Sequence, residues 1–87
     1  MRELPLLIKG CGEVRGYVFR QIERSAGGYI YQVTHPDIKS PHYEVWRRKI
    51  NKLHNVVSKP TSKAFGTWAW SFRSIEKARE KLKQLHT

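Results

Sequence analysis

Residues 65–85, FGTWAWSFRSIEKAREKLKQL, constrain the fold of this chain most, because an aromatic strand pattern runs directly into an amphipathic helix pattern. Trp68, Trp70 and Phe72 occupy every second position, and small residues lie between them. This alternation is typical of a half-buried strand. We expect the three rings to share one face and to pack in the core beneath the helix, because large rings dominate small cores. The alternative is that the tryptophans face outward as a platform on which bases stack.

The helix that follows is predicted by several local signals that agree. Ser74 stands where an N-cap is expected, and Glu76 lies in the first turn, where a negative charge is favourable. Two pairs, Glu76 with Arg79 and Glu80 with Lys83, have the i,i+3 spacing of weak ion pairs. A single apolar stripe is formed by Ile75, Ala78, Leu82 and Leu85.

Upstream of this element the pattern predicts further strands. Residues 4–8 are apolar but contain Pro5, which favours an edge strand or an extended arm. Residues 13–24 and 29–35 read as two strands of a hairpin, with Gly16 as a bulge or a point of close approach. We expect Gly27 and Gly28 to supply the positive φ angles of the turn between them.

The middle of the chain is harder to assign. Pro36 and Pro41 bracket a segment that we expect to be a polar loop, and residues 43–50 read as a third strand. Residues 51–63 have no clean period and form either an irregular connection or one containing a short strand at Val56 and Val57. The predicted fold is α+β, an antiparallel meander of three to four strands with one C-terminal helix packed on one face. Such a sheet can leave its other face to solvent or to a partner.

Positive charge is the strongest functional signal. The 87 residues are enough for one small domain, residues 1–87, and they contain 17 Lys and Arg against seven Asp and Glu, a formal charge of +10. A surplus of this size favours association with polyanions and is a first indication of nucleic-acid binding.

Signals for catalysis, metals, cofactors and membranes are weak. His35, His42, His54 and His86 lack metal-ligand spacing, no glycine-rich phosphate loop is present, and a single Cys11 predicts no disulfide framework. Glu13, Glu23 and Glu44 are isolated among basic residues, which favours surface pairing over acid–base work. We therefore expect no cofactor, no metal and no enzyme activity. Apolar runs are too short for a membrane span or a signal peptide, which predicts a cytoplasmic protein.

The first functional hypothesis is a nucleic-acid-binding module that contacts phosphates through a basic sheet and loop surface. Tyr17, Tyr31 or Trp46 would stack on bases. The predicted strand–strand–strand–helix order also resembles small readers that lay a three-stranded sheet on DNA, such as AP2-type and integrase arm-binding domains. The candidate phosphate contacts are Arg15, Arg20, Arg47, Arg48, Lys49, Lys52, Lys59 and Lys63.

A second hypothesis comes from a resemblance over residues 43–80. The block YEVWRRKIN, followed by FGTWAWSF and EKA, is similar to small uncharacterised basic proteins of bacterial mobile elements and phages. The resemblance implies no established activity, but proteins from such sources include inhibitors of host nucleases, anti-CRISPR proteins among them. A basic inhibitor of this kind would bind an acidic or nucleic-acid-processing protein, or its guide RNA.

A third hypothesis is a small toxin-type ribonuclease, with His35, His42 and Arg47 as the first candidates for stabilising the transition state.

Overall fold

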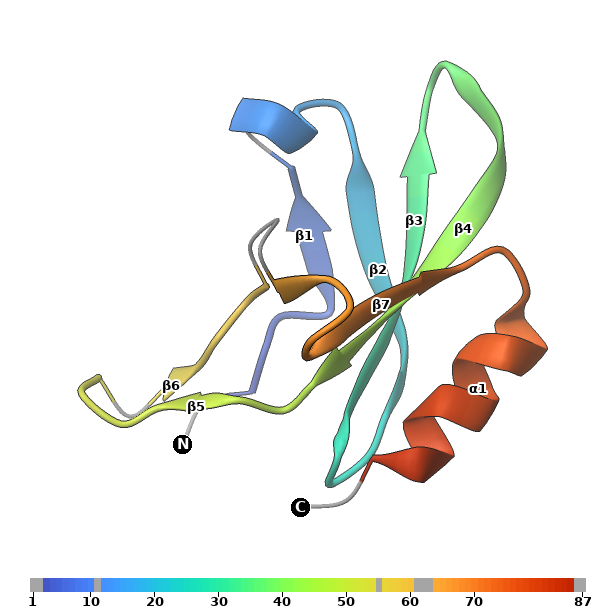
Figure 1. The fold of residues 1–87 in the computed structure, drawn as a ribbon. Helices are drawn as coiled ribbons and strands as arrows, with labels where there is room; N and C mark the ends of the chain where they lie inside the picture. Colours follow the sequence, from blue (N-terminus) through green and yellow to red (C-terminus); the bar gives the residue numbers. More distant parts are fainter. Residues whose placement is uncertain (1–2, 11, 55, 61–63, 86–87) are drawn as a thin grey trace.

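The computed structural model describes residues 3–10, 12–54, 56–60 and 64–85, in which a five-stranded antiparallel sheet packs against one helix (Figure 1). A two-stranded sheet is inserted in the chain between the last two strands of the large one. The predicted α+β class and the C-terminal helix are confirmed, with five strands in place of three or four. The large sheet has the order β1 (Leu7–Lys9), β2 (Val18–Arg24), β3 (Gly28–His35), β4 (Ile38–Arg47) and β7 (Ala69–Phe72), and the small one pairs β5 (Ile50–Asn51) with β6 (Val56–Val57).

The helix α1 (Ile75–Gln84) begins as its sequence predicts. The Ser74 hydroxyl oxygen accepts a hydrogen bond from the Lys77 amide at 3.4 Å, and Ser74 donates to the Glu76 carboxylate at 2.7 Å. The expected pair of Glu76 with Arg79 is wrong, because Arg79 instead binds Glu23 on β2. This contact joins the helix to the sheet.

One face of the sheet packs beneath α1. Ile30 of β3 and Val45 of β4 are fully buried, and they meet Ala78, Leu82 and Leu85 of the helix. Ile30 and Val45 lie directly opposite each other in the β3–β4 register, which places the two side chains on the same face. The predicted apolar stripe of the helix is therefore confirmed as the contact surface.

The opposite face of the sheet holds a second core. Tyr29, Tyr31 and Trp46 are buried there with Phe19, and the Tyr31 and Trp46 rings stack with their centroids 4.2 Å apart. Such a sheet can leave this face to solvent or to a partner, but here the face is largely covered. Segments before β1 and between β4 and β7 cover much of it, through Leu4, Val57 and Ala64.

Two strands differ in their bounds from the prediction. The strand expected over residues 13–24 begins only at Val18, because Gly12–Val14 forms a 3-10 helix and Gly16 has φ +91°. The loop expected between Pro36 and Pro41 is a tight turn, and Pro41 lies inside β4. Proline is tolerated there because β4 pairs with β7 only from Tyr43 onward, so residues 38–42 form an open edge on that side.

The turn between β2 and β3 uses its glycines differently from the prediction. Gly27 and Gly28 are not among the described glycines with positive φ, so the expected turn geometry is wrong. A Cβ atom at Gly27 would lie 2.2 Å from the carbonyl oxygen of Leu85, and one at Gly28 would lie 2.3 Å from that of Trp46. Both positions need glycine because backbone approaches them closely.

The aromatic rings of residues 68–72 divide between the two cores. Trp70 and Phe72 pack against the helix-side core, which confirms the prediction for these two. Trp68 precedes β7 and packs against the other core, so the expectation of one shared face is wrong. The strand alternation has not begun at Trp68, because Gly66 with φ +86° turns the chain just before it.

Candidate nucleic-acid interface

The connection from β4 to β7 is strongly cationic. No Asp or Glu occurs from residue 45 to residue 75. This stretch contains Arg47, Arg48, Lys49, Lys52, Lys59, Lys63 and Arg73. The absence of acidic residues over this length is visible in the sequence, and it marks the segment as the part of the chain least able to neutralise its own charge.

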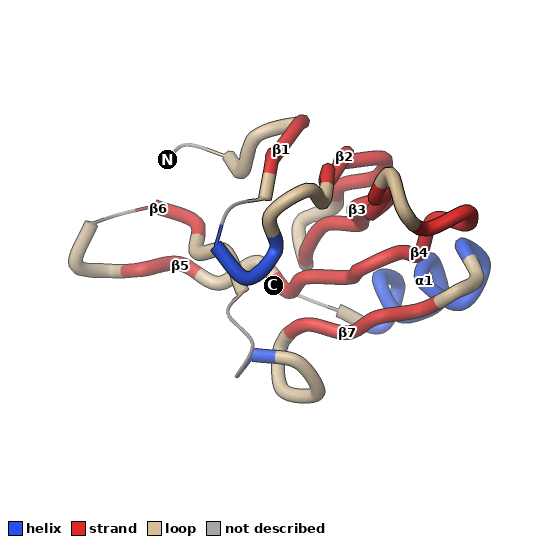
Figure 2. Tube along the Cα trace, turned by 90° about the horizontal axis from the view of Figure 1, so that it is seen from above, coloured by secondary structure: helices blue, strands red, loops and turns tan. Residues whose placement is uncertain are grey.

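The β5–β6 hairpin carries part of this charge away from the sheet. Figure 2 shows the hairpin and α1 at opposite ends of the molecule. At its tip the Asn51 side-chain oxygen accepts hydrogen bonds from the amides of Leu53 at 3.0 Å and His54 at 3.3 Å. This turn leaves Lys52 exposed and Leu53 85% exposed. We call the described residues 49–54 and 56–59 the basic arm.

A pocket of about 200 Å³ opens where the cover of the second core is incomplete. Phe19, Glu44 and Trp46 belong both to its lining and to the face of the sheet opposite the helix. The remaining lining comes from β1 and the residue after it, from the 3-10 helix, and from the end of the basic arm and the segment that follows it. These residues are Ile8, Lys9, Gly10, Val14, Lys59, Pro60 and Phe65.

The lining combines apolar groups with two cations. Val14 is 41% exposed and Phe65 is 40% exposed, which is a large exposed fraction for apolar side chains. Lys9 and Lys59 are also exposed and line the same pocket. Arg15 directly follows the 3-10 helix that supplies Val14, so it is a third cation next to the pocket in the chain.

Glu44 places a carboxylate in this apolar surrounding. The residue is only 9% exposed. Its Oε1 atom accepts a hydrogen bond from the indole Nε1 of Trp46 at 2.9 Å, and its Oε2 atom lies 3.3 Å from Nε2 of His42. The expectation that Glu44 pairs at the surface is wrong, because the residue is buried and its polar side-chain neighbours among the described residues are Trp46 and His42.

The aromatic residues predicted to stack on bases are largely inaccessible. Trp46 is 3% exposed and Tyr31 is fully buried, so both rings belong to the second core and the stacking prediction is wrong for them. Tyr17 is half-buried and its ring centroid lies 4.6 Å from that of His35. The sequence reasoning missed Phe65, which is the exposed ring beside the pocket.

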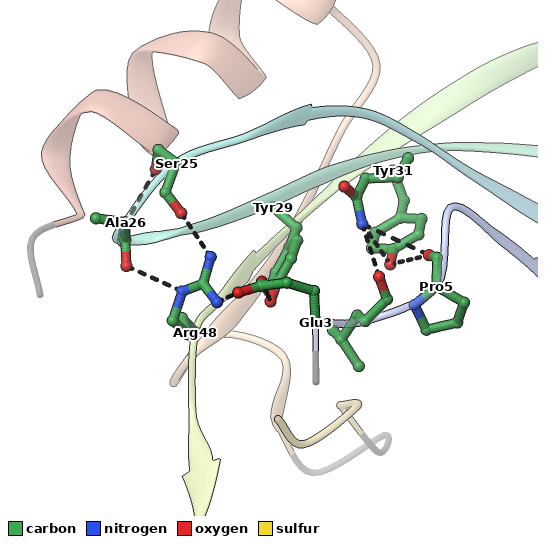
Figure 3. A network of polar contacts seen from close by, with 10 residues as sticks. Glu3, Pro5, Ser25, Ala26, Tyr29, Tyr31 and Arg48 are labelled. Atoms are coloured by element: carbon green, nitrogen blue, oxygen red, sulfur yellow. Dashed lines mark hydrogen bonds and ion pairs between the residues drawn. The ribbon is translucent and has the colours of Figure 1, made fainter. Parts of the chain in front are cut away.

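Arg48 is held by the protein itself (Figure 3). Its guanidinium donates to the carbonyl oxygen of Ser25 at 2.9 Å and to that of Ala26 at 3.1 Å, and it forms an ion pair with Glu3. The centroid of the Tyr29 ring lies 4.9 Å from its Cζ atom. These contacts use three of the five N–H donors that the sequence reasoning assigned to phosphates.

The other predicted cations differ in where the structure places them. Arg20 and Arg47 are exposed, but each follows a residue that faces the pocket, so strand alternation directs them to the opposite face of the sheet. Lys63 lies outside the described residues. Lys49 has its Nζ atom 5.0 Å from the centroid of Trp68. The predicted residues that remain on the arm or beside the pocket are Arg15, Lys49, Lys52 and Lys59.

The candidates for a ribonuclease centre do not meet. His42 and Arg47 are five residues apart on β4, which separates them by about 16 Å at roughly 3.3 Å per residue, and they face opposite sides. His35 lies at the end of β3, where its Nδ1 accepts a hydrogen bond from the Asp37 amide at 3.1 Å. His42 instead shares a shallow hollow with Ser40, Ser71 and Arg73.

Within the described residues there is no cluster of three or more His, Cys, Asp or Glu side chains able to hold a metal ion. No helix in that part of the chain is long and apolar enough to cross a bilayer. Comparison with protein-family models, with curated proteins and with solved structures finds no match to this chain.

Proposed function

We propose that this protein binds single-stranded nucleic acid through the basic arm and the pocket beside it. The observation that carries the proposal is the placement of Lys59. This residue ends the basic arm, which lies within a stretch rich in cations and free of acids, and it also lines an open apolar pocket that has an exposed aromatic ring.

The charges support contact with phosphates. Lys49, Lys52 and Lys59 are exposed on the arm, and Lys9 lies at the pocket. Among the described residues none of these four lysines forms an ion pair. Lysines that are not neutralised by the protein are available to displace counterions from a nucleic-acid backbone, which is the main source of affinity in such complexes.

The shape supports a single strand over a duplex. The pocket is concave and small, and Phe65 is exposed beside it. Bases in a duplex are stacked on one another, whereas those of a single strand can turn out and stack on an aromatic side chain. The arm would then follow the backbone while the pocket receives a base.

The test is a fluorescence-anisotropy titration with labelled single-stranded RNA, single-stranded DNA and duplex DNA, at several salt concentrations around about 0.15 M. We expect a single strand to bind most tightly. For single strands log K falls by about 0.7 per phosphate neutralised for each unit of log salt, so the triple variant K49A/K52A/K59A should lower this slope by about 2.

A matched control is the triple variant K39A/K77A/K83A, which removes the same charge from β4 and the helix, away from the arm. It should change the slope far less. Equal effects of the two variants would show that the charge acts as a diffuse field, and the proposed surface would be wrong.

No binding by the wild-type protein at about 0.15 M salt would contradict the proposal as a whole. In that event the inhibitor hypothesis becomes the next to test. It expects a stoichiometric complex with an acidic or nucleic-acid-processing protein, isolated by size-exclusion chromatography.

A further inference from the structure

The lining of the pocket includes a hydrogen-bond acceptor. Glu44 is 9% exposed, and the indole N–H of Trp46 holds one of its oxygens at 2.9 Å while His42 lies 3.3 Å from the other. These neighbours fix the direction of the carboxylate but do not use all of its lone pairs, since a carboxylate accepts about four hydrogen bonds. A ligand that enters the pocket therefore meets a partly desolvated acceptor in its lining.

A buried acceptor selects its ligand by the position of donor groups. Cytosine presents its N4 amino group as a donor, whereas uracil has the O4 acceptor at the same place. Facing Glu44, the amino group forms a charge-assisted hydrogen bond, but a carbonyl oxygen meets a second acceptor and leaves both unsatisfied. The carboxylate consequently favours a base with an amino group.

The rest of the pocket combines a small volume, apolar surface and two cations, which would suit one small ring and its flanking phosphates. Its volume of about 200 Å³ is below the roughly 300–1,000 Å³ of pockets for drug-sized ligands. Phe65 and Val14 offer exposed apolar surface for the ring. Lys9 and Lys59 come from separate segments of the chain and line the same pocket, so they are placed to meet the flanking phosphates.

We infer that the pocket holds one unstacked cytosine base of a bound strand and that Glu44 reads its amino group. This inference rests on the proposed function, because the pocket is filled from a strand held by the basic arm. It makes Glu44 a specificity-determining residue in a surface that otherwise contacts backbone.

The first test compares oligocytidine and oligouridine RNA of equal length by anisotropy. Wild-type protein should bind oligocytidine about five- to tenfold more tightly, as expected for one good base contact. The variant Glu44→Gln keeps the shape of the side chain but adds an amide donor, so the preference should fall to within about twofold through weaker binding of oligocytidine. Phe65→Ala should weaken both oligomers by at least roughly fivefold and keep the preference, because stacking is tolerant of the base.

A second measurement does not depend on a variant that folds. The Trp46 indole N–H donates to Glu44, so its signal in an NMR correlation spectrum reports on this carboxylate. Cytidine monophosphate should shift this signal in the wild-type protein, and uridine monophosphate should shift it much less.

The outcomes separate the two proposals. Tight binding of both oligomers with no preference, and equal shifts of the Trp46 signal, would overturn the reading by Glu44 and leave single-strand binding intact. Absence of binding to both oligomers would overturn single-strand binding and this inference with it.

Discussion

The guanidinium of Arg48 lies 4.9 Å from the centroid of the Tyr29 ring and binds the carboxylate of Glu3 at the same time. Arg48 directly follows β4, and its side chain joins this end of the strand to two other segments. It binds Glu3 in the N-terminal segment and two carbonyl oxygens of the β2–β3 turn. Its side chain is only 15% exposed, so solvent screens these contacts less than it screens a surface ion pair.

Substitution of Arg48 should destabilise the fold. Arg48→Ala removes one ion pair and leaves carbonyl acceptors without their donor, which we expect to lower the free energy of unfolding by about 1–3 kcal/mol. Arg47→Ala is the matched control, because Arg47 is exposed and forms no ion pair among the described residues. It should change stability by less than about 0.5 kcal/mol. Urea denaturation measures both, and similar losses for the two variants would contradict the assignment.

Tyr29 should ionise late in an alkaline titration. Burial, with the hydrogen bond to Glu3 as a second cause, raises the pKa of Tyr29 to about 12 from a usual value of 10.0. The raised pKa means that the folded state holds the proton more tightly than the unfolded state. The resulting stability is fully present below pH 10 and is lost as the pH rises through about 12. Phenolate absorbance should show this late step, and Tyr29→Phe should reduce its amplitude, while Tyr31, whose pKa burial also raises, still ionises late. A wild-type titration complete near pH 10 would count against this prediction.

Glu3 should make the fold less stable at acid pH, whereas Tyr29 makes it less stable at alkaline pH. Hydrogen bonds from Tyr29 and then Arg48 hold the pKa of Glu3 below its usual 4.5. A lowered pKa contributes stability that is present above the unfolded pKa of 4.5 and is lost as the pH falls through the folded value. Glu3→Gln should therefore reduce the loss of thermal stability on acidification below that pH. If wild type and variant lose stability in parallel on acidification, the carboxylate of Glu3 does not contribute to the pH dependence of stability.

Gly27 should not accept a side chain. Gly27→Ala places a Cβ 2.2 Å from the Leu85 carbonyl oxygen, so the end of the helix has to move away from the β2–β3 turn. We expect a loss of about 1–3 kcal/mol, as for other overpacked positions. Ala26→Ser, at the exposed neighbouring position, is the control and should be nearly neutral. Thermal denaturation measures both variants. Equal stability of Gly27→Ala and Ala26→Ser would show that backbone does not approach Gly27 closely.

The helix and the main hairpin were predictable because their signals are local. The N-cap Ser74 and the apolar stripe that follows it both predict the same helix, and the aromatic and β-branched residues of β3 predict a strand. The cover over the second face was not predictable, because Val57 and Ala64 lie in a segment with no period and join a core that includes residues far away in the chain, such as Phe19 and Tyr31.

The candidate site shows the same limit. Charge indicated Lys49, Lys52 and Lys59, and the structure places these residues on the basic arm. The role of Arg48 depends on Glu3, which is 45 residues away, and no local pattern could reveal it. Glu44 shares a strand face with Trp46, and this was visible from spacing, but its burial depends on the cover over that face.

The open edge of β4 bears on how the protein avoids self-association. Residues 38–42 extend past β7, and an exposed strand edge of this kind is a template on which a second chain can add a strand and begin to aggregate. Pro41 has no amide hydrogen to offer such a strand, and Lys39 brings a charge that repels an identical copy. The proline tolerated at this position therefore also acts as a guard against polymerisation of the sheet.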